Sequence, residues 1–173
     1  MFKYFDAHTH VQFAAFKDDY KEVIERALAT GVWMVNVGTQ KDTSKSAVEI
    51  ANQYKEGVYA TVGLHPVHTS KSFHDAEELG AAPPKRGEPR SAIVAEREEF
   101  DYDFYKKLAE DPKVVAIGEC GLDYFRITDH EAKIRQKEVF LKQIELAKEI
   151  KKPLMIHCRN AFRDLIEILQ TTN

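Results

Sequence analysis

The stretch Ala116-Ile117-Gly118-Glu119-Cys120-Gly121 decides how the rest of the chain can be interpreted. Together with the two valines before it, it predicts a buried apolar strand over Val114–Glu119 that ends on a carboxylate. A charge at the end of such a strand is costly unless another group compensates it. Two divalent ions bridged by Glu119 would compensate that charge, and further metal ligands are then expected at the ends of the other predicted strands.

Strands and helices alternate on both sides of this stretch. The other predicted strands are Tyr4–His8, Val32–Val37, Val58–Leu64 and Leu154–Cys158. Apolar residues spaced three and four apart predict a helix after each strand, and we expect Asn160 to cap the last one. Five successive βα units with nearly continuous apolar strands predict a parallel sheet covered by helices. Periodicity alone leaves open whether this α/β sheet is doubly wound or part of a barrel.

The composition is that of a globular domain. Hydrophobic residues make up 43% and charged residues 31% of the 173 residues, and we interpret 1–173 as one domain. The net charge of −3 argues against a surface that holds nucleic acid by overall electrostatics, although a local basic cleft is compatible with it. The sequence has no signal-peptide pattern, no apolar run of membrane-spanning length and only two cysteines, so we expect a cytoplasmic protein without disulfides.

A proline- and glycine-rich segment interrupts the βα pattern. It covers about residues 70–96 and contains the run Ala81–Arg90. We predict a mobile loop insertion here. Because it follows the carboxyl end of a strand, it either reaches over a site or is a solvated insertion without a catalytic role.

Two further strands deliver imidazoles at the same end as Glu119. His8 and His10 end the first strand, and the period of two in a strand turns both to the same side. His157 ends the fifth strand. Each signal alone is weak, but the carboxyl ends of barrel strands converge on one cavity, where these side chains can share metal ions.

At this point the sequence resembles the TatD family of metal-dependent hydrolases. The segments that carry the resemblance appear in the family's order; they are Phe5-Asp6-Ala7-His8-Thr9-His10, Gly63-Leu64-His65-Pro66, Ile117-Gly118-Glu119-Cys120-Gly121-Leu122-Asp123-Tyr124, Ile156-His157-Cys158-Arg159 and the helical set Gln136, Phe140 and Gln143. The resemblance covers essentially the whole chain apart from the 70–96 segment. It implies the first five units of a (β/α)₈, or TIM, barrel.

The resemblance also implies a two-metal site that hydrolyses phosphodiesters in DNA. His8 and His10 would hold one ion, His157 the second, and Glu119 would bridge both as the catalytic carboxylate. Zn, Mg and Mn remain alternatives for the ions. The remaining implied groups would bind or orient the phosphate; they are His65, Arg126 and Arg159.

The sequence departs from the family pattern beyond its fifth unit. The family's strand-six histidine and strand-eight aspartate have no counterpart in these 173 residues. We therefore expect a truncated barrel with little hydrolase activity. Its open sheet edges favour association with another chain.

Other interpretations of the same residues remain. One is another hydrolase of the same barrel superfamily, acting on an amide, lactone or phosphotriester, although those often place a modified lysine where Glu119 stands. Another is a non-catalytic fragment that keeps a metal half-site, and a third is a plain structural α/β domain.

We expect Cys120 and Cys158 to point away from the cavity as apolar fillers. The histidines that match no part of the pattern are predicted to lie on the surface; they are His68, His74 and His130.

Overall fold

The computed structural model describes residues 2–70, 72–75, 92–95, 97–125, 127 and 129–172, with backbone alone at 72–75 and 92–95. Five parallel strands form one sheet in the order β1-β2-β3-β6-β7. Their bounds are β1 Tyr4–Thr9, β2 Val32–Val37, β3 Val58–Val62, β6 Val114–Asp123 and β7 Leu154–Arg159. A second sheet has two antiparallel strands, β4 Ser72–Asp75 and β5 Ala92–Ala95.

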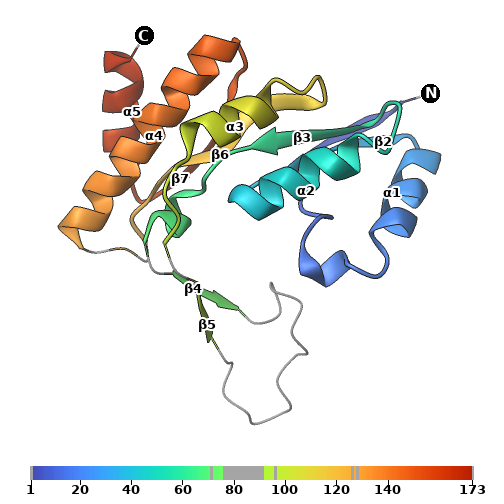
Figure 1. The fold of residues 1–173 in the computed structure, drawn as a ribbon, viewed down its shortest axis with the longest axis horizontal. Helices are drawn as coiled ribbons and strands as arrows, with labels where there is room; N and C mark the ends of the chain where they lie inside the picture. Colours follow the sequence, from blue (N-terminus) through green and yellow to red (C-terminus); the bar gives the residue numbers. More distant parts are fainter. Residues whose placement is uncertain are drawn as a thin grey trace.

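Helices connect the parallel strands. The α-helices are α1 Tyr20–Ala29, α2 Lys41–Ala51, α3 Tyr102–Ala109, α4 His130–Ile150 and α5 Phe162–Thr171, and the 3₁₀ turns are η1 Ala14–Phe16 and η2 Pro66–Thr69. The strand order never reverses along the chain, so right-handed crossovers place α1, α2, α3 and α4 on the same face of the sheet. This decides between the two sheet types, because a doubly wound sheet reverses its order. The five strands curl into a half-barrel, with α2 and α3 in front of the sheet in Figure 1.

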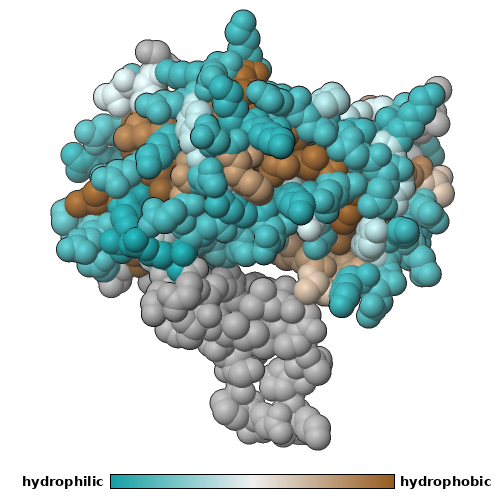
Figure 2. Space-filling view, in the orientation of Figure 1, coloured by the Kyte–Doolittle hydropathy of each residue, from teal (hydrophilic) through white to brown (hydrophobic). Residues whose placement is uncertain are grey.

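The main core lies between the sheet and the helices. It contains the alternate residues of β3, Val58, Ala60 and Val62, together with buried residues of α1 and α2 such as Ile24 and Ala47. The outer face of the helical layer is largely hydrophilic, with apolar side chains in scattered areas (Figure 2). This distribution agrees with the amphipathic stripes that the sequence predicted.

Two buried glutamines of α4 tie the helix to the ends of the central strands. The Gln143 side chain accepts a hydrogen bond from the Leu64 N–H (2.9 Å) and donates one to the Leu64 carbonyl (3.0 Å). Gln136, two turns away on the same face, bonds both backbone groups of Asp123 in the same way, at 2.8 and 3.0 Å. Each amide thereby satisfies both the N–H and the carbonyl of one residue, as a neighbouring strand would.

Replacing Gln143 by leucine should destabilise the chain by about 2–4 kcal/mol, because two buried backbone groups of Leu64 lose their partners. Urea unfolding followed by circular dichroism measures the free energy of unfolding. The matched control is Gln53→Leu at an exposed position, which should change it by about 0.5 kcal/mol at most. Equal effects of the two substitutions would contradict the tethering role.

Several element boundaries differ from those that the sequence predicted. Strand β6 runs on to Asp123 instead of ending at Glu119, because the register against β7 gains one residue between Ile117 and Cys120 and the ladder then resumes. Asn160 does not cap α5; its φ of 56° is left-handed, and Ala161 is the N-cap residue without a side-chain hydrogen bond. The prediction that Gly31 follows α1 in a left-handed conformation is confirmed by its φ of 81°.

The sequence did not predict the β4–β5 pair. Ser72 pairs with Ala95 and Asp75 with Ala92, within the segment that we predicted to be a mobile loop. Figure 1 shows this pair projecting away from the main sheet. Each strand has only four residues and their pairing is long-range, so no local periodicity indicates it. The rest of the predicted loop, including Ala81–Arg90, lies outside the described residues.

Both outer strands of the main sheet have a neighbour on one side only among the described residues. These are β1 and β7, and every residue of β1 except Thr9 is exposed, with Tyr4 68% accessible. No described helix combines the length and the apolar character that crossing a bilayer requires.

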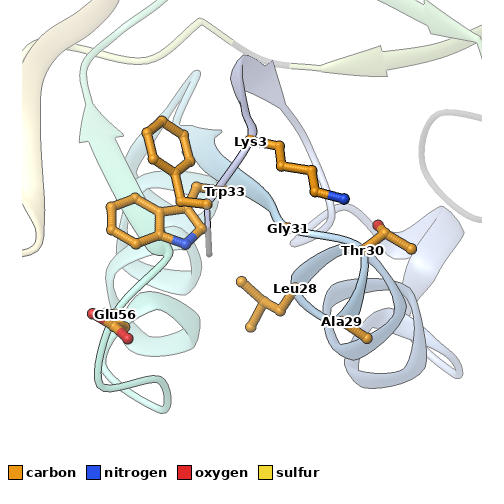
Figure 3. A pocket seen from close by; sticks show the side chains of 8 residues that line it. Lys3, Leu28, Ala29, Thr30, Gly31, Trp33 and Glu56 are labelled. Atoms are coloured by element: carbon orange, nitrogen blue, oxygen red, sulfur yellow. The ribbon is translucent and has the colours of Figure 1, made fainter.

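A surface hollow of about 480 Å³ lies at the amino ends of β1, β2 and β3 (Figure 3). It is lined by Phe2, Lys3, Leu28, Ala29, Thr30, Gly31, Trp33 and Glu56. These residues precede or open the strands, whereas the predicted ligands follow or end them. The hollow is therefore separate from the candidate site.

Candidate metal centre

Three histidines and one carboxylate from the ends of three strands meet at the carboxyl end of the sheet. His8 lies on β1 and His10 just after it, Glu119 lies on β6 and His157 on β7. The Glu119 backbone N–H donates to the Gly38 carbonyl at 2.9 Å, which fixes this part of β6 beside the end of β2. The four side chains fall into two groups that share Glu119.

The first group contains His8, His10 and Glu119. The Nε2 atoms of the two histidines are 3.2 Å apart, and His8 Nε2 is 3.3 Å from Glu119 Oε2. Two nitrogens that bind one tetrahedral Zn²⁺ at about 2.1 Å lie roughly 3.4 Å from each other. The spacing of the imidazoles therefore fits the shared ligation of one ion.

The orientation of His10 is set by its surroundings. Its Nδ1 lies 3.0 Å from the Val37 carbonyl, and its ring stacks on Phe13 with centroids 4.4 Å apart. A hydrogen bond from Nδ1 to that carbonyl leaves the lone pair of the neutral ring on Nε2, which faces His8. This is the tautomer that a metal ligand at this position needs.

The second group is built around His157. Its Nδ1 lies 3.0 Å from Glu119 Oε1, and its Nε2 lies 2.9 Å from Asp123 Oδ2. Burial lowers the pKa of His157, but the hydrogen bonds and charges of the two carboxylates outweigh it and raise the pKa above its ordinary value. The negative potential that holds a proton here also attracts a divalent cation.

His65 completes the second group geometrically, with its Nε2 3.6 Å from Glu119 Oε1. Desolvation lowers the pKa of His65 to about 4 despite the nearby carboxylates, so the ring is neutral at pH 7. Its Nδ1 accepts the Val67 N–H at 3.2 Å, which places the remaining proton on Nε2. We therefore interpret His65 as a hydrogen-bond donor into the site and not as a metal ligand, although its distances would allow ligation.

Glu119 occupies the centre of the arrangement and is only 12% exposed. Burial alone would raise its pKa, but the hydrogen bond from His157 and electrostatic attraction by the neighbouring imidazoles hold the pKa below its usual range. Its Oε2 faces one histidine group and its Oε1 the other. Imidazole and carboxylate donors in this arrangement fit borderline divalent ions such as Zn²⁺ or Mn²⁺.

Asp123 lies in the segment Ile117–Tyr124 that resembles the family, but the sequence predicted no role for it. Its carboxylate is 4% exposed and contacts His157 on one oxygen and the Phe125 N–H on the other, at 2.9 Å each. A carboxylate behind a metal-binding histidine fixes the ring and its tautomer. The signal was present, since Glu119 and Asp123 are four residues apart and a period of two places them on one face of a strand.

The other predicted site residues have mixed outcomes. Arg159 is exposed, and its guanidinium lies over the Phe125 ring, 3.6 Å from the centroid. Arg126 lies outside the described residues. His130 is exposed as predicted, but the prediction for His68 is wrong. His68 is 7% exposed because η2 turns its ring toward His65, with centroids 6.1 Å apart.

The side chain of His74 also lies outside the described residues. Both cysteines carry free thiols, as expected. Cys120 is fully buried beside Phe140 and Leu165, and Cys158 packs against the same cluster, so the prediction that they fill apolar space behind the site is confirmed.

Comparisons with known proteins identify the family of the chain. A family model described as TatD related DNase matches residues 5–173. The protein named "Uncharacterized metal-dependent hydrolase YabD" from Bacillus subtilis is 38% identical over 167 residues, which cover 96% of this chain and 54% of YabD. The protein named 3′-5′ ssDNA/RNA exonuclease TatD from Erwinia tasmaniensis is 33% identical over 168 residues, with the same two coverages.

Solved structures show the same fold. YjjV, a TatD homologue from Escherichia coli, superposes with a TM-score of 0.70 at 24% identity, covering 98% of this chain and 56% of YjjV. A TatD-family hydrolase from Entamoeba histolytica gives a TM-score of 0.70 at 23% identity, covering 99% and 55%. The chain thus spans about half the length of the relatives that it matches. By its match over residues 5–173, the chain belongs to the family of TatD related DNases.

Proposed function

We propose that this chain is a metal-dependent hydrolase that cleaves phosphodiester bonds at an end of single-stranded nucleic acid. The observation that carries the proposal is the position of Glu119, whose two oxygens face separate histidine groups. Relatives named as 3′-5′ ssDNA/RNA exonucleases support the substrate class. The rival superfamily reactions, on amides, lactones or phosphotriesters, gain no support from these names.

The chain's own residues have distinct roles in this proposal. His8 and His10 would hold one divalent ion and His157 the second, and Glu119 would contribute a carboxylate oxygen to each. When bound, such ions polarise a phosphoryl oxygen and lower the pKa of water. Asp123 holds the His157 ring in place, and the protonated Nε2 of the neutral His65 donates a hydrogen bond toward a phosphate oxygen or Glu119.

We further propose that the 173-residue chain alone turns over slowly. His8 is 44% exposed on β1, an outer strand of the sheet, so solvent reaches the first group directly. Electrostatic stabilisation of a transition state is strongest where water is excluded. Association of another polypeptide with β1 or β7 would shield this side. We also expect the protein in the cytoplasm, where its nucleic-acid substrate occurs.

The test is hydrolysis of an end-labelled single-stranded oligonucleotide with Mn²⁺, Mg²⁺ or Zn²⁺. We expect slow release of terminal nucleotides that a chelator abolishes. His157→Ala should lower the rate at least tenfold, because the second ion loses its imidazole. The matched control is His130→Ala, which removes an exposed imidazole and should leave the rate unchanged. Hydrolysis that persists with the chelator or in His157→Ala would contradict the proposal.

A further inference from the structure

An exposed aromatic residue, Phe125, follows two residues after Asp123, the carboxylate that contacts His157 of the candidate metal centre. Phe125 is 51% exposed, although it follows the buried end of β6. Its backbone N–H donates to Asp123 Oδ1, and the other oxygen of that carboxylate contacts His157 Nε2. A single carboxylate therefore connects the position of Phe125 to the position of a proposed metal ligand.

Arg159 is paired with this ring. Its guanidinium carbon lies 3.6 Å from the Phe125 centroid, and the Arg159 carbonyl accepts the Tyr124 N–H at 2.8 Å. Asp123 and Arg159 are also register partners on β6 and β7. The backbone of both strands thus holds the two side chains in one stacked unit at the carboxyl ends of β6 and β7.

Such a unit is suited to a nucleobase. Unpaired bases stack on phenylalanine rings and on arginine planes, and every base offers a flat face regardless of sequence. Phe125 is 51% exposed even with Arg159 over its ring, so part of its surface stays available to a second group. The contacts from the Phe125 N–H through Asp123 to His157 put a base stacked here at the same end of the sheet as the histidine groups.

We propose that Phe125 and Arg159 form a base-stacking platform for the terminal nucleotide of a single-stranded nucleic acid. This proposal rests on the proposed function and adds a subsite to it. The platform recognises the base as a planar group, so it binds all four bases and discriminates weakly between DNA and RNA. Arg159 also contributes positive charge next to the phosphate in a chain whose net charge is −3.

The test measures binding to the full chain with Mn²⁺ present. The first probe is a single-stranded oligonucleotide with 2-aminopurine at its 3′ end and an uncleavable phosphorothioate at the last linkage. The second probe has an abasic 3′ residue instead. We expect the 2-aminopurine fluorescence to be quenched on binding, and Phe125→Ala to weaken binding of the first probe about tenfold while leaving the second unchanged.

Two further variants sharpen the result. Phe125→Trp should restore both affinity and quenching, because it keeps a flat aromatic surface. Phe2→Ala is the matched control, since Phe2 is 49% exposed and stacks on Trp33 at the opposite end of the sheet. That control should leave the affinity for both probes unchanged.

The outcomes separate the two proposals. If Phe125→Ala weakens the binding of both probes equally, or of neither, the platform proposal is wrong while the hydrolase proposal stands. If the wild-type chain binds and quenches the first probe but hydrolyses no phosphodiester, the hydrolase proposal fails while the platform stands. If the wild-type chain binds neither probe, both fail.

Discussion

Glu119→Gln should lower the affinity of the chain for Mn²⁺ or Zn²⁺ about a hundredfold or more, since loss of groups that only support metal ligands already costs 10–100-fold. The side chain keeps its shape but loses the negative charge that lies between the two histidine groups. An amide also presents its NH₂ group to one of them, where Glu119 presents two acceptor oxygens.

Isothermal titration calorimetry of the metal-free chain measures this affinity. The matched control is Glu138→Gln, which removes an exposed carboxylate from α4 and should leave metal binding unchanged. The melting temperature of both metal-free variants should stay close to that of the wild type, so that a folding defect can be separated from lost ligation. Wild-type affinity in Glu119→Gln would overturn the proposed metal centre.

Gly121→Ala should destabilise the chain by about 3 kcal/mol or more, through overlap with its neighbour strand and backbone strain together. A Cβ at this position would overlap the carbonyl oxygen of His157. Its φ of +136° is also in the region that L residues with side chains rarely adopt. Relief of the overlap requires β7 to move away from β6, and His157 moves with it.

Urea unfolding measures the loss of stability, and calorimetry should show weaker metal binding in the part that stays folded. Val115→Ala on the same strand provides the comparison, because it removes half-buried methyl groups without adding an overlap and should cost about 1 kcal/mol. A Gly121→Ala variant as stable as Val115→Ala would show that β6 and β7 are not packed as closely as described.

Local patterns in the sequence determined the elements and the family. The helical stripes, the apolar strands and the order of the quoted segments all indicated βα units, and each depends on residues within one or two turns or one strand. The same patterns were inaccurate at boundaries. Strand β6 continued through a register shift to Asp123, and Asn160 adopted a left-handed conformation instead of capping α5.

Only the tertiary structure decided which side chains of the site contact each other. Asp123 supports His157 across 34 residues of sequence, and Gln143 satisfies Leu64 across 79. Neither partnership leaves a periodic signal, because each depends on which strands and helices become neighbours in space. The sequence alone indicated which candidate ligands are present and at which strand ends they lie. Their pairing, the proton positions on their rings and the stacking of Phe125 on Arg159 follow from the curl of the sheet, which brings distant segments within hydrogen-bonding distance.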